Sequence, residues 1–163
     1  MQKIFVISDL HFSHLNMALR RGFDNIEDHD NHIVEKWNSV VNSKDTVWIL
    51  GDITMEKSEP YHLIDKLMGF KNVILGNHDR PQHISKLLNH VNKVCSSWTK
   101  SGNILTHIPI HTRELESRYR KNIHGHLHEH NIKDESLDVF DNRYFNVSCE
   151  QLDYTPIELN TIN

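Results

Sequence analysis

The stretch Ile4-Phe5-Val6-Ile7-Ser8-Asp9-Leu10-His11 lies near the start of this 163-residue sequence. Its first four residues are β-branched or aromatic, which predicts a buried strand at residues 4–7. Asp9 and His11 follow that strand two positions apart. In an extended chain, such side chains project to the same side of the backbone. The stretch therefore predicts a buried strand that delivers a carboxylate and an imidazole to one place.

Two further apolar runs end in a glycine that is followed by a polar residue. Gly51-Asp52 comes after the run at residues 46–50, and Gly76-Asn77-His78-Asp79 comes after the run at residues 72–75. Glycine lets the backbone turn sharply, so we expect Asp52 and Asn77 to be presented directly after their strands. In open α/β sheets, ligands gather at the carboxyl ends of the strands. The three runs thus predict one sheet edge that carries polar side chains.

Histidines supply the remaining candidate metal ligands. His107 follows a predicted strand at residues 103–106, and Gly125-His126-Leu127-His128 repeats the two-residue spacing. Aspartate and asparagine oxygens combined with imidazole nitrogens suit Mn, Fe or Zn. No single fragment offers enough ligands to hold one ion, so the fold has to assemble the site.

In this order, the five fragments resemble the pattern of the calcineurin-like metallophosphoesterase family, which reads D-x-H, G-D, G-N-H-[DE], H and G-H-x-H. They span residues 9–128, and residues 8–14, 37–41 and 154–157 resemble the small single-domain phosphoesterases of bacteria and phages. The resemblance implies an α/β fold, a four-layer sandwich of two mixed β-sheets flanked by helices. It also implies a single metallophosphoesterase domain over residues 1–163.

The resemblance further implies a role for each residue of the pattern. One metal ion would be held by Asp9, His11, Asp52 and His128. The other ion would be held by Asp52, Asn77, His107 and His126. Two divalent ions, Mn or alternatively Fe, Ni or Zn, would then share Asp52 and hold a bridging hydroxide that attacks phosphorus. His78 would be the catalytic residue that contacts the phosphate and protonates the leaving oxygen.

Departures from one branch of the family narrow the expected substrate. Met55 and Asp79 stand where the resembled Ser/Thr protein phosphatases have an orienting acid and a glutamate. This favours a phosphodiesterase acting on a nucleotide or another small molecule. A nuclease or nucleic-acid end-processing phosphatase is the alternative from the same chemistry. A non-catalytic scaffold is a third interpretation, and the presence of His78 and of every ligand position argues against it.

Four residues are candidate substrate contacts. They are His14, Asn16, Arg21 and Arg80. The first two follow the first metal fragment, and the arginines could bind phosphate oxygens with two hydrogen bonds each. Helix capping by Asn16 and simple surface charge for the arginines are the structural alternatives.

The segment at residues 109–122 contains no clear element and connects two metal fragments, so we expect it to lie over the site. Its basic residues are Arg113, Arg118, Arg120 and Lys121. They could hold additional phosphate groups of a substrate. Alternatively, Arg118 pairs with Glu114 on a solvated helix face.

Composition predicts a cytoplasmic protein with a small substrate. The formal net charge of −4 disfavours a broad contact with duplex nucleic acid, because such binding depends on many Lys and Arg contacts to phosphates. Cys95 and Cys149 are expected to be reduced thiols. The apolar run at residues 4–7 is far too short to span a membrane.

Helical spacing of apolar residues and the placement of prolines predict four helices. They cover residues 16–21, 27–41, 60–68 and 81–88. Further strands are expected at residues 103–106, before His124, at 143–147 and at 157–159. Most of the residues His14, His29, His32, His62, His83 and His90 are expected to be surface or helix residues. Asp45, Asp65 and Asp134 are expected to be solvated carboxylates.

Overall fold

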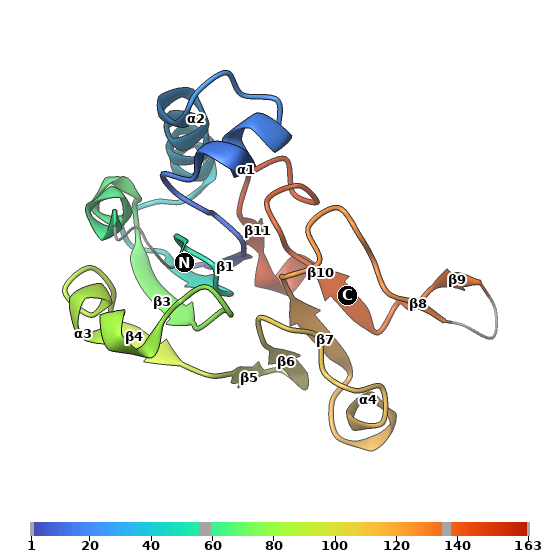
Figure 1. Ribbon diagram of the computed structural model, residues 1–163. Helices are drawn as coiled ribbons and strands as arrows, with labels where there is room; N and C mark the ends of the chain where they lie inside the picture. Colours follow the sequence, from blue (N-terminus) through green and yellow to red (C-terminus); the bar gives the residue numbers. More distant parts are fainter. Residues whose placement is uncertain (1, 56–59, 135–137, 163) are drawn as a thin grey trace.

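The computed structural model describes residues 2–55, 60–134 and 138–162, and Figure 1 shows their arrangement. The first sheet has the strand order β11-β1-β2-β3-β4. Strands β1 (Ile4–Ile7), β2 (Thr46–Ile49), β3 (Phe70–Ile74) and β4 (Lys93–Cys95) are parallel, and β11 (Ile157–Glu158) runs antiparallel to β1. The carboxyl ends of the parallel strands therefore meet at one edge, as the sequence predicts.

The second sheet has the order β10-β7-β6-β5. Strands β6 (Asn103–Leu105), β7 (Lys121–His124) and β10 (Tyr144–Asn146) are parallel, whereas β5 (Trp98–Lys100) is antiparallel to β6. A hairpin of β8 (Lys133–Asp134) and β9 (Val139–Phe140) projects from the rest of the molecule (Figure 1). Both large sheets are mixed, which confirms the predicted fold class.

Helices α1 (Leu15–Arg20) and α2 (Ile26–Val40) lie within one residue of their predicted positions. Residues 60–68 instead form a 3-10 helix, η1 (Tyr61–Lys66), and residues 81–88 form the 3-10 turn η2 (Pro81–His83) and the single turn α3 (Ile84–Leu87). Short connections between strands commonly use 3-10 turns because they leave room for little more than one turn of helix. A further single turn, α4 (Glu114–Ser117), precedes β7, and a 3-10 turn, η3 (Leu159–Thr161), follows β11. Within the described ranges, no helix has the length and apolar character that crossing a bilayer requires.

Both faces of the first sheet are buried, each against a different partner. Phe5 and Ile7 belong to a hydrophobic cluster that includes Trp37 of α2. Val6 belongs to a second cluster that includes Ile123 of the other sheet. Because successive strand residues point to opposite faces, one face of the first sheet packs on α2 and the other packs on the second sheet. The two sheets thus lie face to face with α2 outside, as predicted.

The two sheets are also joined by backbone hydrogen bonds at the end of β1. The Ser8 N–H donates to the Val147 carbonyl at 2.9 Å, and the Cys149 N–H donates to the Ser8 carbonyl at 3.1 Å. Ser8 and Ser148 consequently form an isolated parallel bridge. This junction places the residues that follow β1 next to those that follow β10.

The segment at residues 109–122 differs from its expected position. Because β6 and β7 are parallel, it leaves the carboxyl end of β6 and has to return to the amino end of β7. Its last residues therefore lie at the far end of the second sheet. The Arg120 N–H donates to the Gly102 carbonyl at 2.8 Å, in the turn that precedes β6.

The basic side chains at the end of this segment consequently contact other parts of the protein and not the candidate ligands. Arg118 forms a 3.7 Å ion pair with Glu114, the i,i+4 pairing that was the alternative interpretation. The ammonium group of Lys121 donates to the Asn142 carbonyl at 2.6 Å. The expectation that Arg118, Arg120 and Lys121 border the site is wrong, because the parallel topology carries them to the opposite edge.

Asp45 also differs from its expected solvated state. It precedes β2 and is only 3% exposed. One carboxylate oxygen accepts from the Lys3 N–H and the other accepts from the Asn42 N–H, both at 2.9 Å. Asp45 therefore braces the turn that leads into β2, at the edge of the sheet opposite Asp52.

Candidate metal centre

The loops after β1 and β2 run side by side and carry the first candidate ligands. The Asp9 N–H donates to the Gly51 carbonyl and the His11 N–H donates to the Asp52 carbonyl, both at 3.0 Å. These bonds continue the pairing of β1 and β2 beyond the strands. They place Asp9, His11 and Asp52 beside one another.

The backbone of these ligands is left-handed, not extended as the sequence suggests. The φ angle is positive at five candidate ligands: 61° at Asp9, 50° at His11, 52° at Asp52, 71° at His126 and 50° at His128. Asp and His enter this region more readily than most residues, but each does so at an energetic cost. Five of the ten such non-glycine residues in the described ranges are thus candidate ligands, and backbone strain of this kind clusters at functional sites.

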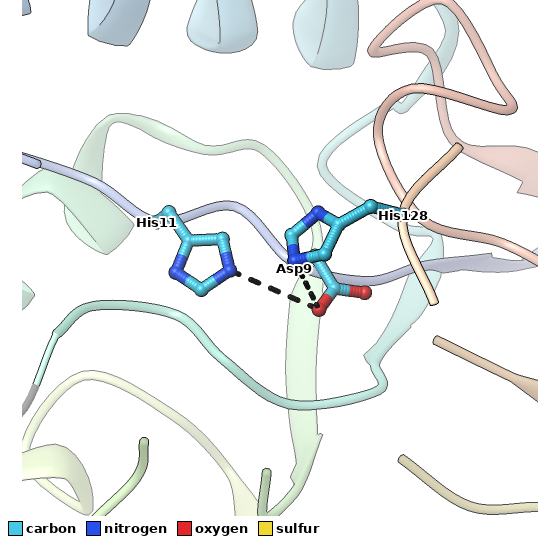
Figure 2. Close-up of side chains that lie close together, drawn as sticks. All are labelled: Asp9, His11 and His128. Atoms are coloured by element: carbon cyan, nitrogen blue, oxygen red, sulfur yellow. Dashed lines mark ion pairs between the residues drawn. The ribbon is translucent and has the colours of Figure 1, made fainter. Parts of the chain in front are cut away.

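The first group of candidate ligands consists of Asp9, His11 and His128. Nε2 of His11 lies 3.9 Å from Oδ1 of Asp9, and Nε2 of His128 lies 4.0 Å from the same oxygen. Figure 2 shows both rings directed toward this oxygen. Oδ1 of Asp9 and Nε2 of His11 are buried and find no hydrogen-bond partner among the described residues. Buried polar atoms without partners are costly, so these atoms fit a divalent ion.

The other oxygen of Asp9 is fixed from two sides. Oδ2 accepts from the His126 N–H and from the Ser148 hydroxyl, both at 2.9 Å. A Cβ on Gly125 would lie 2.4 Å from this oxygen and 2.0 Å from the Ser8 hydroxyl. The glycine before His126 therefore has a packing reason, since only a residue without a side chain fits there.

The second group of candidate ligands consists of Asp52, His107 and His126. Nδ1 of His107 donates to the Leu50 carbonyl at 2.7 Å. Nε2 of the same ring faces two acceptors, Oδ2 of Asp52 at 3.3 Å and Oδ1 of Asn77 at 2.9 Å. Oxygen atoms that converge on one imidazole nitrogen in this way suit a shared cation. Burial lowers the pKa of His107, but the adjacent Asp52 carboxylate outweighs it and the pKa is raised.

Asp52 faces both groups with a single oxygen. Besides its contact with His107, Oδ2 lies 3.9 Å from Nε2 of His11 and 3.9 Å from Nε2 of His78. Oδ1 instead accepts from the His78 N–H at 2.9 Å, which fixes the orientation of the carboxylate. The side chain of His78 is 27% exposed, compared with 2% for His11. His78 therefore lies at the accessible side of the site.

Gly51 and Gly76 allow the close approach of the loops after β2 and β3. Gly51 has a φ of 93°, as expected for a sharp turn, and a Cβ there would lie 2.6 Å from Gly76. Gly76 is not one of the described glycines with a positive φ. Its Cβ would lie 2.2 Å from Oδ1 of Asp52, so the reason for this glycine is space and not turn geometry.

Asp79 holds these two loops together, a role that the sequence did not reveal. Its carboxylate accepts from the N–H groups of Asp52 and Gly76 at 2.8 Å and of Ile53 at 3.2 Å. The residue is 5% exposed. Burial raises the pKa of Asp79, and the three hydrogen bonds act against that rise.

The candidate substrate contacts have different surroundings. The Arg21 side chain is 2% exposed and points into the protein, so the structure does not present it to a phosphate. Nδ1 of His14 accepts from the Met17 N–H at 3.1 Å and caps α1. His14, not Asn16, therefore has the capping role, and its ring lies 6.4 Å from that of His11. Asn16 and Arg80 are exposed.

Burial and Glu150 change the pKa values of the two histidines in the first group, His11 and His128. Burial lowers the pKa of His11 to about 3, which leaves its imidazole in the neutral form that binds metals. A hydrogen bond to Glu150 raises the pKa of His128. Burial opposes ionisation of Glu150, but His128 and Arg21 outweigh it and lower its pKa to about 2.

Comparison with known proteins identifies sequences that are similar to this chain. The sequence model of a family described as calcineurin-like phosphoesterase matches residues 2–159. The Uncharacterized protein MJ1445 of Methanocaldococcus jannaschii is 30% identical over 172 residues, which cover 99% of this chain and 90% of that protein. The Gene 66 protein of Mycobacterium phage L5 is 41% identical over 91 residues, and this match covers 53% of the chain and 44% of the phage protein.

Two solved structures share the fold. The protein of unknown function AQ665 from Aquifex aeolicus superimposes with a TM-score of 0.72 at 23% identity, covering 99% of this chain and 98% of that chain. The nuclease MPE of Pseudomonas putida gives a TM-score of 0.53 at 17% identity, covering 77% and 61%. At these identities both likenesses show the fold alone.

Proposed function

Because this chain belongs to the calcineurin-like phosphoesterase family, whose members hydrolyse phosphate esters, we propose that it hydrolyses a small phosphodiester with two divalent metal ions. The observation that carries the proposal is the position of Oδ2 of Asp52. It faces His11 of the first group at 3.9 Å and His107 of the second group at 3.3 Å. A carboxylate oxygen in this position suits a ligand that two ions share.

The donor set fits these ions, with Mn as the proposed metal and Fe, Ni or Zn as alternatives. The first ion would be held by Asp9, His11, Asp52 and His128, and the second by Asp52, Asn77, His107 and His126. When bound, such a pair polarises the phosphate ester and lowers the pKa of water. His78, partly exposed beside Asp52, offers an imidazole that can protonate the leaving oxygen.

A cavity beside the second group supports an ester with an organic substituent. It has a volume of about 310 Å³ and lies next to Asn77 and His107. Its walls include Leu75 and Ile108, and Ile108 is 52% exposed. Among the described residues that line it, none is Lys or Arg. Such a wall suits an uncharged group, for example a nucleoside, better than a second phosphate.

Charge and cysteine chemistry support the remaining parts of the proposal. The net charge of −4 disfavours a broad contact with duplex nucleic acid. A nuclease or nucleic-acid end-processing phosphatase is therefore the second candidate function, behind hydrolysis of a small phosphodiester. Cys95 and Cys149 are free thiols, which supports a reducing, cytoplasmic location.

The test starts from protein stripped of metal with a chelator. Addition of Mn should restore hydrolysis of bis-p-nitrophenyl phosphate to the native protein and much less to Asp52→Asn. Values of kcat/KM for cyclic nucleotides, dinucleotides, phosphomonoesters and oligonucleotides then identify the substrate class. Absence of metal-dependent hydrolysis across this panel would reject the enzyme and favour a scaffold.

A further inference from the structure

Glu150 contacts a candidate metal ligand directly. Oε1 of Glu150 lies 2.9 Å from Nδ1 of His128, and the Glu150 side chain is 16% exposed. An ionised carboxylate only accepts hydrogen bonds, so Nδ1 carries the proton of this contact. That leaves Nε2 as the ring atom directed toward Asp9 (Figure 2). Glu150 thus selects which nitrogen of His128 is offered to an ion.

Arg21 joins this carboxylate to the backbone of a second candidate ligand. Its Nε donates to Oε1 of Glu150 at 2.8 Å. Its Nη2 donates to the Asp9 carbonyl at 2.7 Å, and its Nη1 donates to the Leu10 carbonyl at 3.1 Å. Because its side chain is 2% exposed, Arg21 forms these bonds out of contact with solvent. One cation therefore holds Glu150 and the left-handed backbone at Asp9 together.

The same chain of contacts extends into α2. Nη1 of Arg21 lies 2.9 Å from Nε2 of His29, and Nδ1 of His29 lies 2.9 Å from Oδ1 of Asp30. Oδ2 of Asp30 accepts from the Ser13 N–H at 3.0 Å. Ser13 is itself left-handed, with a φ of 58°. The contacts thus fix both ends of the loop that carries His11, and we refer to Arg21, His29, Asp30 and Glu150 as the Arg21–Glu150 network.

In the second group, the ring nitrogen of His107 that points away from Asp52 meets a neutral acceptor and not a carboxylate. Nδ1 of His107 donates to the neutral Leu50 carbonyl. The Asp79 carboxylate that supports this group accepts from backbone N–H groups. In the first group, by contrast, the ring of His128 contacts the charged carboxylate of Glu150, a member of the Arg21–Glu150 network.

We propose that Glu150 and Arg21 are positioning residues that set the affinity of the Asp9, His11 and His128 group for its ion, and leave the other group unaffected. The inference rests on the proposed two-metal function. Carboxylates that orient metal-binding histidines typically change metal affinity by roughly 10- to 100-fold. A selective effect follows because, in the described part of the chain, the hydrogen bonds of the network reach ligands of one group, namely His128 and the backbone of Asp9.

The test is a calorimetric titration of metal-stripped Glu150→Gln and Glu150→Ala with Mn. Glutamine keeps an acceptor oxygen for His128 and loses the charge, whereas alanine loses both. We expect one of the two ions to bind about tenfold more weakly in Glu150→Gln and about 100-fold more weakly in Glu150→Ala. The affinity for the other ion should remain native in both variants.

Glu158→Ala is the matched control. Glu158 also forms an ion pair, 3.0 Å from Lys3, and its side chain is 24% exposed. Its loss should leave both metal affinities native. Thermal unfolding of each metal-free variant reports whether the fold is kept, and the milder Glu150→Gln variant decides the outcome if Glu150→Ala does not fold.

Two results would overturn the inference. Native affinity for both ions in Glu150→Gln and Glu150→Ala would show that Glu150 does not position His128. Equal weakening of both ions would show that Glu150 acts on the whole fold. Failure of the native chain to bind two ions would instead reject the proposed function, so the titration separates the two proposals.

Discussion

Each of the two candidate ligand groups is supported by a carboxylate, but the two carboxylates act on different parts of their group. Glu150 contacts the ring of His128 at 2.9 Å and so orients a side chain. Asp79 accepts from the N–H groups of Asp52 and Gly76, both at 2.8 Å, and so fixes the backbone that carries a ligand. The difference shows that one site is preorganised in two ways. Substitutions at the two supports should therefore have separable consequences.

The largest effect is expected at Asp52, because its Oδ2 faces both groups. Asp52→Asn should weaken the binding of both ions. It should also lower kcat/KM on the order of 100- to 1,000-fold, which corresponds to a rise of a few kcal/mol in the activation free energy. His11→Ala affects the first group alone and should cost less activity. Metal content and turnover of the two variants provide the comparison. Near-native turnover of Asp52→Asn with both ions bound would contradict the shared role.

His78 lies beside both groups without belonging to either. If it protonates the leaving oxygen, His78→Ala should slow hydrolysis of nucleoside esters by about 100-fold or more. Esters of p-nitrophenol should be affected much less, because nitrophenolate departs without a proton. Metal content should stay native. A uniform loss across leaving groups would point to phosphate binding, and a loss of metal would point to a structural role.

Asp79→Asn tests the backbone support of the second group. The amide can no longer accept from all three N–H groups, so the free energy of unfolding should fall by roughly 2–3 kcal/mol. Because Asp79 also holds Gly76, the residue before Asn77, binding of the ion assigned to Asn77, His107 and His126 should weaken more than binding of the ion assigned to Asp9, His11 and His128. This is the reverse of the expectation for Glu150→Gln. Denaturant unfolding and metal titration measure both quantities. A variant of native stability would show that these hydrogen bonds do not brace the loops.

Asp45 is a buried carboxylate at the opposite edge of the sheet, and it separates stability from metal binding. Hydrogen bonds from the Lys3 and Asn42 N–H groups hold the pKa of Asp45 below its ordinary value. A carboxylate with a lowered folded pKa contributes stability above its unfolded pKa, and this contribution is lost as the pH falls. Asp45→Asn should therefore lose about 1–2 kcal/mol at neutral pH, and its difference from the native protein should shrink below about pH 4.

For Asp45→Asn, urea unfolding at several pH values measures this difference, and metal affinity should stay native. A pH-independent difference would mean that the charge of Asp45 does not contribute. A change in metal affinity would mean that the two sheet edges are coupled.

The smallest effect is expected for the segment before β7. Replacing Arg118, Arg120 and Lys121 together with Gln should leave KM for nucleotide substrates unchanged, because these residues lie at the sheet edge away from both groups. The same measurement on a small nitrophenyl ester is the control. If KM rose for nucleotides but not for the nitrophenyl ester, this segment would have to contribute to substrate binding.

The sequence was informative where hydrophobic periodicity is strong. Four elements begin and end within about two residues of their predicted bounds: the buried strands β1, β2 and β3 and the helix α2. Each of them carries apolar side chains at the spacing typical of a buried strand or an amphipathic helix. Strands β4 and β5 were missed, since each has three residues and includes exposed ones such as Lys93 and Thr99. So short a strand has no periodicity to recognise.

For the site, the pattern located the candidate ligands but not what holds them. Spacing alone suggested extended backbone at Asp9 and His11, whereas hydrogen bonds to the neighbouring loop impose left-handed conformations there. Arg21 and Glu150 are 129 positions apart in sequence. Their contact depends on how α1 and the loop after β10 come together in the fold, and neither residue lies in the motif that identifies the family.

The central claim is that the two groups together hold two divalent ions that share Asp52. The most direct measurement is the number of Mn ions bound per chain by metal-stripped native protein and by Asp52→Asn, determined by calorimetric titration. If the two ions share Asp52, the native chain should bind two ions, and the variant should bind both of them more weakly. Binding of a single ion by the native chain, or undiminished binding of two ions by Asp52→Asn, would contradict it.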